Sequence, residues 1–498
     1  MFEYITPVQA GSTSADIYRF MQIIDEYCPG LHSVILARGG KIFYECYYEP
    51  FHKDFKHRMY SVSKSFVSVA VGLLVEDGKL QLTDRIVDLF PEYAARYVNY
   101  DEDPEWGSIT IRDMLTMSTA HTYNENWLDV DTNDRAIQYF QTKTGKLSGT
   151  HFDYDSGASD MLAAVVERIT GRPFMDLLQD RIFRHIGFSE DAYCLQAPGG
   201  RSFGASAVLC TSRDLLAFAQ FVMNQGTWEG QRYMNAEYLA AATIKQVDNN
   251  DYGLRGFDCH GYGYQIWIGN KGRFFFNGMG CQFAICDPAK DFICVVNADC
   301  QGNEIAKQAI FQALYDHVLD QLDTDDAAKA AAESDFAARL QTFTEARKLF
   351  YLPGPTESPF ADEIWGRTYR LRENPMGIRW FRLEAQGQQG RICFENATGE
   401  KELPFGLGCN AFGKFPEEGY SDFIVSKPCP GHFYDCAASA AWVEPRKLQI
   451  KVQVIDKYLG NGTWTLSFKG DQVNVTMTKT AEGFMNEYVG RAVGQAKE

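Results

Sequence analysis

The sequence lacks an excess of basic residues, and this absence excludes one broad class of partner. Its 498 residues include 48 Lys and Arg against 65 Asp and Glu, which gives a formal net charge of -17. A nucleic-acid-binding surface neutralises phosphates with clustered Lys and Arg. We therefore expect no nucleic-acid partner, and we interpret the negative charge as a contribution to solubility.

Long apolar runs are also missing. A membrane-spanning helix needs about 18 consecutive apolar residues, and the longest candidate, Phe66–Val75, is much shorter. The first residues, MFEYITPVQAGSTSADIYRF, contain no basic segment followed by an apolar one, so they do not resemble a signal peptide. These features predict a cytoplasmic protein with no membrane partner.

Paired cysteines and metal-ligand spacings are absent too. The 13 cysteines include no C-x-x-C pair, and their number is odd. Without an export signal, we expect reduced thiols rather than a disulfide framework. H-E-x-x-H does not occur, and no closely spaced Cys and His residues match a zinc site. The sequence predicts neither a metal nor a cofactor.

What the chain does contain, up to about residue 322, is a mixture of helical and strand patterns. Residues 31–48 predict a hairpin around Gly39-Gly40, and residues 272–299 predict two more strands around a polar turn. Apolar residues three or four apart predict helices over residues 61–76, 159–170, 212–224 and 304–322. Hairpins at both ends with helices between them favour an α+β fold with one antiparallel sheet.

The composition changes twice after that point. Residues 323–350 are rich in Ala, Glu and Lys and predict a connecting helix, and YLPGPTESP, residues 351–359, predicts a linker. Short alternating runs then continue to the C-terminus and are typical of an antiparallel β-barrel or sandwich. The predicted domains are a catalytic domain over residues 1–322, a connector over 323–359 and a β domain over 360–498.

The most informative stretch is HRMYSVSKSFVSVAVGLLVEDG, residues 57–78, because Ser61 and Lys64 lie three residues apart where a helix begins. On a helix these side chains share a face. A serine hydroxyl needs a neighbouring base to become a nucleophile, and a lysine can serve if burial or a nearby cation lowers its pKa by about 3 units, roughly 4 kcal/mol. The alternative is an N-cap serine beside a solvated lysine, since S-x-x-K occurs by chance about once in a chain of this length.

Further segments resemble the serine β-lactamase and penicillin-binding-protein superfamily, in the branch that contains class C β-lactamases, DD-peptidases, D-aminopeptidases and family VIII carboxylesterases. ITIRDMLTMSTAH is similar to the ITIRHLLTHTSG segment of that family, with an altered ending. The resemblance covers about the first 320 residues and implies a sheet flanked by helices with a helical subdomain. The matching segments, in family order, are residues 60–93, 109–121, 152–174 and 209–232.

The resemblance also implies a role for individual residues. Ser61 is the nucleophile, Lys64 and Tyr154 manage its proton, and Ser156 holds the hydrogen-bond network of the Y-x-S motif. A phenol becomes a useful base when a cation stabilises its anion, so one proton shared by these groups would titrate as a coupled unit. Taken alone, Tyr154-Asp155-Ser156 is better interpreted as a surface turn.

The third motif of the family is K-T-G, K-S-G or H-x-G on a strand. A literal K-T-G at residues 143–145 precedes Tyr154, against the family order, and lies in a polar stretch that predicts a loop. We therefore reject this K-T-G as catalytic and prefer FFFNGMGCQFAI, residues 274–285, which is strand-like and correctly placed.

In that stretch Phe276, Asn277 and Gly278 occupy the motif. Gly278 permits close approach of a substrate backbone, and the N–H of Met279 is the expected oxyanion donor beside that of Ser61. Phe276 is a departure, because relatives carry a cation there that helps to bind a substrate carboxylate. This departure weakens the β-lactamase and carboxypeptidase interpretations.

We therefore expect a serine hydrolase that acts through an acyl-enzyme on a small ester, amide, β-lactam or D-amino-acid peptide. The expected partner is a small-molecule or short-peptide substrate. A homo-oligomer is compatible with the sequence, which does not determine the oligomeric state. The alternative is a catalytically silent ligand-binding or regulatory protein that keeps the fold. The C-terminal β domain weakly resembles the lipocalin-like appendages of some relatives.

Overall fold

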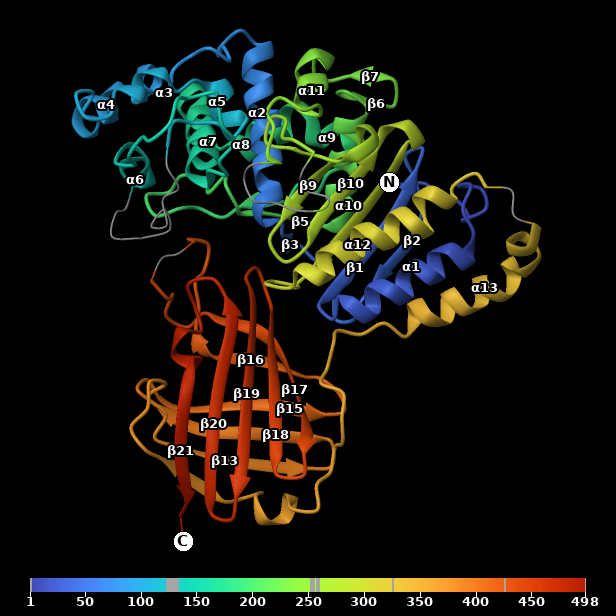
Figure 1. The fold of residues 1–498 in the computed structure, drawn as a ribbon, viewed down its shortest axis with the longest axis vertical. Coiled ribbons are helices and arrows are strands. Elements are labelled where there is room, and N and C mark those ends of the chain that lie inside the picture. The colour runs from blue at the N-terminus through green and yellow to red at the C-terminus, as the bar shows by residue number, and fades with distance from the viewer. Residues whose placement is uncertain are drawn as a thin grey trace. The chain divides into compact units, whose positions relative to one another are not determined.

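The structure is a computed structural model that describes residues 2–121, 134–250, 256, 260–324, 327–424 and 427–497, with side chains left out at 327–330. The chain divides into two compact units (Figure 1). Unit 1 comprises Met1–Lys348 with Asp422–Ser426, and unit 2 comprises Leu349–Ser421 with Lys427–Glu498. The domain boundaries at residues 322 and 359 stay predictions of the sequence.

Unit 1 is built around a six-stranded antiparallel sheet. Its strands, in spatial order, are β2 (Lys41–Tyr47), β1 (Leu31–Arg38), β11 (Phe292–Ala298), β10 (Gln282–Asp287), β9 (Phe274–Gly278) and β8 (Trp267–Ile268). The predicted hairpin forms β1 and β2, and β1 also pairs with β11, so that Leu31 lies opposite Ala298. Segments from the two ends of the unit therefore lie side by side (Figure 1).

Each face of this sheet packs against its own helices, because successive strand residues point to opposite faces. Phe275 and Phe283 contact Phe311 of α12 (Glu304–His317), and α12 packs on α1 (Ser14–Tyr27). On the other face, α10 (Ser212–Met223) packs on β1, β10 and β11. The connecting helix predicted over residues 323–350 contains α13 (Ala327–Glu345), which packs against α1 within unit 1.

The middle of unit 1 is mostly helical, as the sequence and its resemblance predicted. Helix α2 (Ser63–Glu76) is buried on every side from Ser63 to Leu74 rather than along one stripe, and it packs against α7 and α8. Its neighbours in the chain are α3 (Ile86–Leu89), α4 (Pro91–Tyr97), α5 (Ile111–Leu115), α6 (Arg135–Phe140), α7 (Ser156–Thr170), α8 (Phe174–Leu178), α9 (Arg184–Ile186) and α11 (Ala236–Ala242). The short strands are β3 (His57–Arg58), β4 (Tyr193–Cys194), β5 (Val208–Cys210), β6 (Thr227–Trp228) and β7 (Gln231–Arg232).

Unit 2 is a closed barrel, so of the two predicted alternatives the barrel is the one that forms. A parallel pairing of β15 with β17, at Gly406 opposite Ser439, closes nine strands into a ring. Phe394, Trp464 and Tyr488 are fully buried and pack together, so aromatic side chains fill this part of the interior. The strands are β12 (Thr368–Leu371), β13 (Trp380–Gln386), β14 (Gln389–Asn396), β15 (Gly399–Leu407), β16 (Ala411–Glu418), β17 (Phe433–Glu444), β18 (Lys447–Ile455), β19 (Leu459–Lys469), β20 (Gln472–Ala481) and β21 (Gly490–Ala496).

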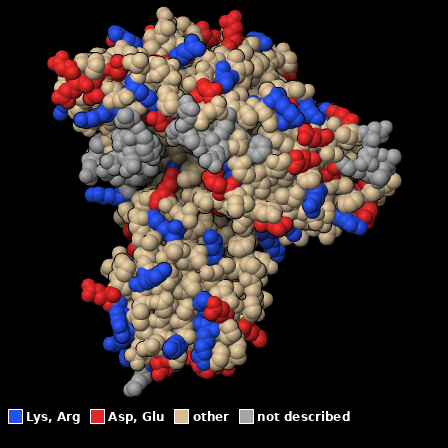
Figure 2. All heavy atoms as spheres, in the orientation of Figure 1, with Lys and Arg blue, Asp and Glu red and all other residues tan. Residues whose placement is uncertain are grey.

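Several features of the whole chain bear on its partners. Within the described residues, no helix is both long enough and apolar enough to cross a membrane, and no group of three His, Cys, Asp or Glu side chains is arranged to hold a metal ion. None of the 12 cysteines in the described ranges forms a disulfide bond. On the face drawn in Figure 2, acidic and basic side chains are interspersed rather than separated by sign.

Candidate active site

Ser61 lies in a tight turn, η1 (Tyr60–Val62), that leads directly into α2. Tyr60 has a φ of 47°, a left-handed conformation that is uncommon for a residue with a side chain and that is often retained at functional sites. Strand β5 fixes this turn from both sides. The N–H of Met59 donates to the carbonyl of Val208 at 2.8 Å, and the N–H of Val208 donates to Ser63 Oγ at 2.9 Å.

Lys64 occupies the first turn of α2 and is only 1% exposed. Its Nζ donates to Ser61 Oγ at 2.9 Å and to the carbonyl of Ala205 at 2.7 Å. Burial lowers the pKa of Lys64 to about 7, although the carboxylates of Asp160 and Asp155 act in the opposite direction. Near neutral pH, a substantial fraction of this amine is therefore uncharged, as a general base requires.

Tyr154 lies beside this pair. Lys64 Nζ is 5.0 Å from the centre of the Tyr154 ring, and the ring itself stacks on Trp267 with centres 5.6 Å apart. The structure thus brings together the three residues to which the sequence assigned the chemistry. Trp267 in turn packs on Tyr262, so Tyr154 lies against a group of packed aromatic side chains.

Ser156 is the first residue of α7 and is half-buried. Its predicted part in a hydrogen-bond network stays a prediction. One turn later, Ser159 Oγ donates to Gln265 Oε1 at 2.7 Å in a fully buried contact.

Gln265 connects three elements around the site. Its side-chain amide donates to the carbonyls of Met114 and Leu115, at 2.8 and 3.1 Å, at the end of α5. Its backbone carbonyl accepts a hydrogen bond from Ser65 Oγ at 2.7 Å. Gln265 was not predicted from the sequence, because glutamine is not a residue type that signals a left-handed φ such as its 58°.

Strand β9 carries the proposed third motif. Phe276 is completely buried, and its ring lies 5.3 Å from that of Phe218 on α10. This position therefore belongs to the hydrophobic core and offers no charge to a substrate. Asn277, the next residue, is half-buried.

Gly278 allows β9 to pack closely against the chain that leads into η1, the turn that contains Ser61. A Cβ on Gly278 would lie 2.3 Å from the carbonyl oxygen of Met59, so only glycine allows this approach. We expected Gly278 to admit a substrate backbone, and the structure adds that it admits the chain's own backbone next to Ser61. Met279 follows in a turn and is half-buried, and its role as an oxyanion donor stays a prediction.

The K-T-G at residues 143–145 follows α6 and lies outside the central sheet. Both the N–H and the hydroxyl of Thr144 donate to Asp103 Oδ1, at 3.1 and 2.9 Å. This Thr144 contact gives the segment a structural role in its loop.

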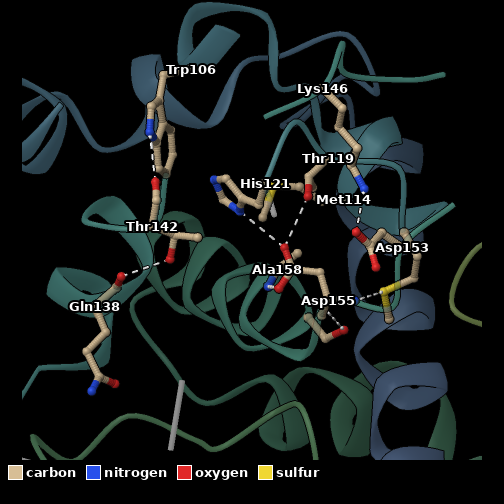
Figure 3. Close-up of polar contacts among 12 residues, drawn as sticks. Trp106, Met114, Thr119, His121, Gln138, Thr142, Lys146, Asp153, Asp155 and Ala158 are labelled. Carbon is tan, nitrogen blue, oxygen red and sulfur yellow. Dashed lines mark hydrogen bonds and ion pairs between the residues drawn. The ribbon is translucent and has the colours of Figure 1, made fainter. Parts of the chain in front are cut away.

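A cluster that the motif analysis did not identify surrounds Asp155, the residue between Tyr154 and Ser156 (Figure 3). Asp155 Oδ1 accepts from the N–H of Ala158 at 3.0 Å and caps α7, while Oδ2 accepts from Thr119 Oγ1 at 3.1 Å and from His121 Nδ1 at 3.2 Å. Burial acts to raise the pKa of Asp155, but its interactions with His121, Ala158 and Thr119 outweigh burial and hold it below its usual value.

Comparison with known proteins assigns the chain to a family. A 6-aminohexanoate-dimer hydrolase from Paenarthrobacter ureafaciens is 26% identical over 297 residues, 55% of this chain and 73% of that protein. A lovastatin esterase from Penicillium rubens is 32% identical over 155 residues, 27% of this chain and 38% of that protein. A solved structure of SurE with D-Leu, 15% identical, covers 97% of this chain and 98% of its own with a TM-score of 0.50, a likeness of fold. A family model described as Beta-lactamase matches residues 28–317, more than half of the sequence including Ser61, Lys64 and Tyr154, and the chain therefore belongs to the beta-lactamase family.

Proposed function

We propose that the protein is a serine hydrolase that acts through an acyl-enzyme, with Ser61 as the nucleophile. The observation that carries this proposal is the 2.9 Å contact between Lys64 Nζ and Ser61 Oγ, made by a lysine whose pKa burial lowers to about 7. When the amine is neutral, its lone pair accepts the Ser61 proton as Oγ attacks a carbonyl carbon.

The remaining steps use groups beside this pair. Backbone N–H groups of Ser61 and Met279 hold the oxyanion that forms. The ammonium of Lys64, assisted by the hydroxyl of Tyr154, returns the proton to the leaving alcohol or amine. Water then attacks the acyl ester with the same base, which releases the acid and regenerates Ser61. No step of this sequence requires a metal ion or a cofactor.

For the substrate, we propose a small ester or amide. Phe276 is buried in the core at the position where a carboxylate-binding cation would stand, which disfavours penicillins and peptides with a free C-terminus. Two relatives named as a 6-aminohexanoate-dimer hydrolase and a lovastatin esterase act on an amide and an ester by their names. Esters are the better test substrates, because their leaving groups need less protonation.

An active-site-directed fluorophosphonate tests the nucleophile. We expect stoichiometric labelling of the wild type at Ser61 and no labelling of Ser61→Ala, because the probe requires an activated hydroxyl. Ser108→Ala, at an exposed serine of the same unit, is the matched control and should label like the wild type. Undiminished labelling of Ser61→Ala would place the nucleophile elsewhere.

The buried Phe276 also favours a second candidate, a ligand-binding protein that keeps the fold without turnover. A panel of p-nitrophenyl esters, nitrocefin and D-alanyl peptides separates the two candidates. Turnover of esters that Ser61→Ala abolishes supports the hydrolase, whereas tight binding without a burst of product supports the silent protein.

A further inference from the structure

We infer that Asp155, held by His121 and Thr119, is a positioning residue that fixes Tyr154 and sets the pH at which Lys64 becomes a base. This inference rests on the proposed function and concerns two positions that are not among the motif residues identified by the resemblance. One is the altered ending of the 109–121 segment, which supplies His121. The other is the middle position of Tyr154-Asp155-Ser156, and the structure brings the two into contact.

The backbone on both sides of Tyr154 is attached to the segment that carries His121. The N–H of Asp153 donates to the carbonyl of Met117 at 2.7 Å, and the N–H of Asp155 lies 3.2 Å from Met117 Sδ. The side chains of Thr119 and His121 point at the carboxylate of Asp155 from the same segment (Figure 3). The backbone of Tyr154 therefore moves only if these contacts break.

His121 is itself fixed. Its ring packs against both Trp106 and Tyr139, with its centre 4.5 and 4.7 Å from theirs, and it is 3% exposed. Because an ionised carboxylate only accepts hydrogen bonds, Nδ1 must carry the proton that it shares with Asp155. The aromatic contacts thus hold the ring in the orientation in which it donates to the carboxylate.

The charge of Asp155 acts on Lys64. Lys64 contacts the hydroxyl of Ser61, the carbonyl of Ala205 and the ring of Tyr154, and the charges of Asp160 and Asp155 act on it without direct contact. Both carboxylates favour the ammonium form.

The two carboxylates differ in their own partners. Asp160 Oδ2 is bound by Arg135 Nε at 3.3 Å, which offsets its charge. Asp155 is bound by the hydroxyl of Thr119, the N–H of Ala158 and the imidazole of His121. Removing the charge of Asp155 should therefore release the proton of Lys64 at a lower pH.

The substitutions Asp155→Asn and Asp155→Ser test this inference, because both residues still cap a helix while neither carries a charge. We expect the acid limb of kcat/KM for a p-nitrophenyl ester to move to lower pH by roughly half a unit, since Asp155 is no contact partner of Lys64. The matched control is Asp153→Asn, which removes a neighbouring carboxylate bound to Lys146 at 3.0 Å and should leave the limb unchanged. An unmoved limb in both Asp155 variants would overturn the inference.

His121→Phe tests the positioning role separately, since it keeps a ring packed against Trp106 and Tyr139 but removes the Nδ1 donor. We expect kcat to fall roughly ten-fold with little change in KM, because a displaced Tyr154 impairs proton transfer rather than binding. An unchanged kcat would contradict this role.

A readout that needs no catalysis separates this inference from the proposed function. In protein labelled with ¹³C at lysine Cε, the Lys64 signal is assigned by its loss in Lys64→Arg and titrated by NMR. A lower Lys64 pKa in the Asp155 variants supports the electrostatic inference even if Ser61 fails to label, a result that would contradict only the proposed function. An unchanged Lys64 pKa contradicts the inference even in an active enzyme.

Discussion

In the proposed mechanism, a buried amine 2.9 Å from a half-buried hydroxyl makes the reactivity of Ser61 depend on a single proton. The energetic cost of burying Lys64 is what makes it useful, because desolvation disfavours the ammonium. The carbonyl of Ala205 accepts one N–H of Lys64 and leaves the lone pair of the neutral amine free to face Ser61. Function at this scale follows from burial more than from any special residue type.

The pH profile of the wild type should report this proton. We expect kcat/KM for a p-nitrophenyl ester to rise with pH through an apparent pKa of about 7, because the base is the deprotonated form of Lys64. Lys64→Arg cannot deprotonate and should lose activity by roughly 10²- to 10⁴-fold at every pH. A flat profile across pH 6–8, or an active Lys64→Arg, would contradict the role of Lys64.

At this scale the sequence predicts the residues assigned to the chemistry but not the residues that hold them in place. Ser61 and Lys64 stand out by their spacing at the start of a helix, and Tyr154 was assigned by the resemblance to the family. Gln265 and His121 could not be predicted, because their contacts with Ser159 and Asp155 join residues 106 and 34 positions apart in the chain. Nothing local in the sequence marks a buried glutamine or histidine as a partner in such a contact.

At the scale of elements, the site depends on the contact between strand β9 and turn η1. The absent side chain of Gly278 sets how closely they approach, since the carbonyl of Met59 lies where a Cβ would be. A backbone carbonyl held by the surrounding turn cannot move aside cheaply. The same contact brings Met279 next to the turn that contains Ser61.

Gly278→Ala should therefore separate β9 from η1. We expect a loss of stability of about 1–3 kcal/mol, as for overpacking elsewhere, and a larger proportional loss of activity, because the two proposed oxyanion donors, the N–H groups of Ser61 and Met279, move apart. Chemical denaturation and ester hydrolysis measure the two effects. Gly107→Ala is the control, since its Cβ would meet only a ring carbon of Tyr100 at 3.9 Å, and equal behaviour of the two variants would refute the packing argument.

Element boundaries show where local sequence patterns stop being informative. The apolar pattern predicts a helix from residue 159, but α7 begins at Ser156 because Asp155 caps it. The pattern predicts a helix to residue 322, but α12 ends at His317 and is followed by a separate turn, Leu319–Gln321. In the first case the helix end is set by a polar contact, which a periodicity of apolar residues does not detect.

At the scale of the whole molecule, unit 1 contains two buried histidines that make the folded state less stable in acid. His32 on β1 and His57 on β3 have ring centres 5.4 Å apart, and both are almost fully buried. Burial lowers the pKa of His57 to about 3 and that of His32 well below its usual value. Both imidazole rings are therefore neutral in the native state near neutral pH.

The sign of the resulting pH dependence is fixed. Below about pH 6.5 these two histidines bind protons in the unfolded chain but not in the folded chain. The free energy of unfolding therefore falls as the pH drops from about 6.5 toward 3. We expect His57→Phe to reduce the loss between pH 7.5 and 5 by roughly 2 kcal/mol, measured by thermal unfolding. His260→Gln, at an exposed histidine, should behave like the wild type, and identical profiles for His57→Phe and wild type would contradict the prediction.

The architecture at this scale was largely predictable. Hairpin and helix patterns predict the α+β unit, and alternating short runs predict the β unit. Closure into a barrel was not predictable, because it depends on a parallel pairing between β15 and β17 that no local pattern encodes. The assignment of α13 to unit 1 follows from the packing of Phe336 and Phe343 on Tyr18, more than 300 residues earlier in the chain.

The pairing of β1 with β11 has a consequence for folding during translation. The serine emerges early, but the strands that flank and brace it, β9 to β11, are synthesised more than 200 residues later. If Ser61 is the nucleophile that we propose, a nascent chain should remain unreactive until translation has passed Ala298 and the sheet has closed. Reactivity toward a fluorophosphonate would then mark chains that have completed folding, and truncated products would escape the label.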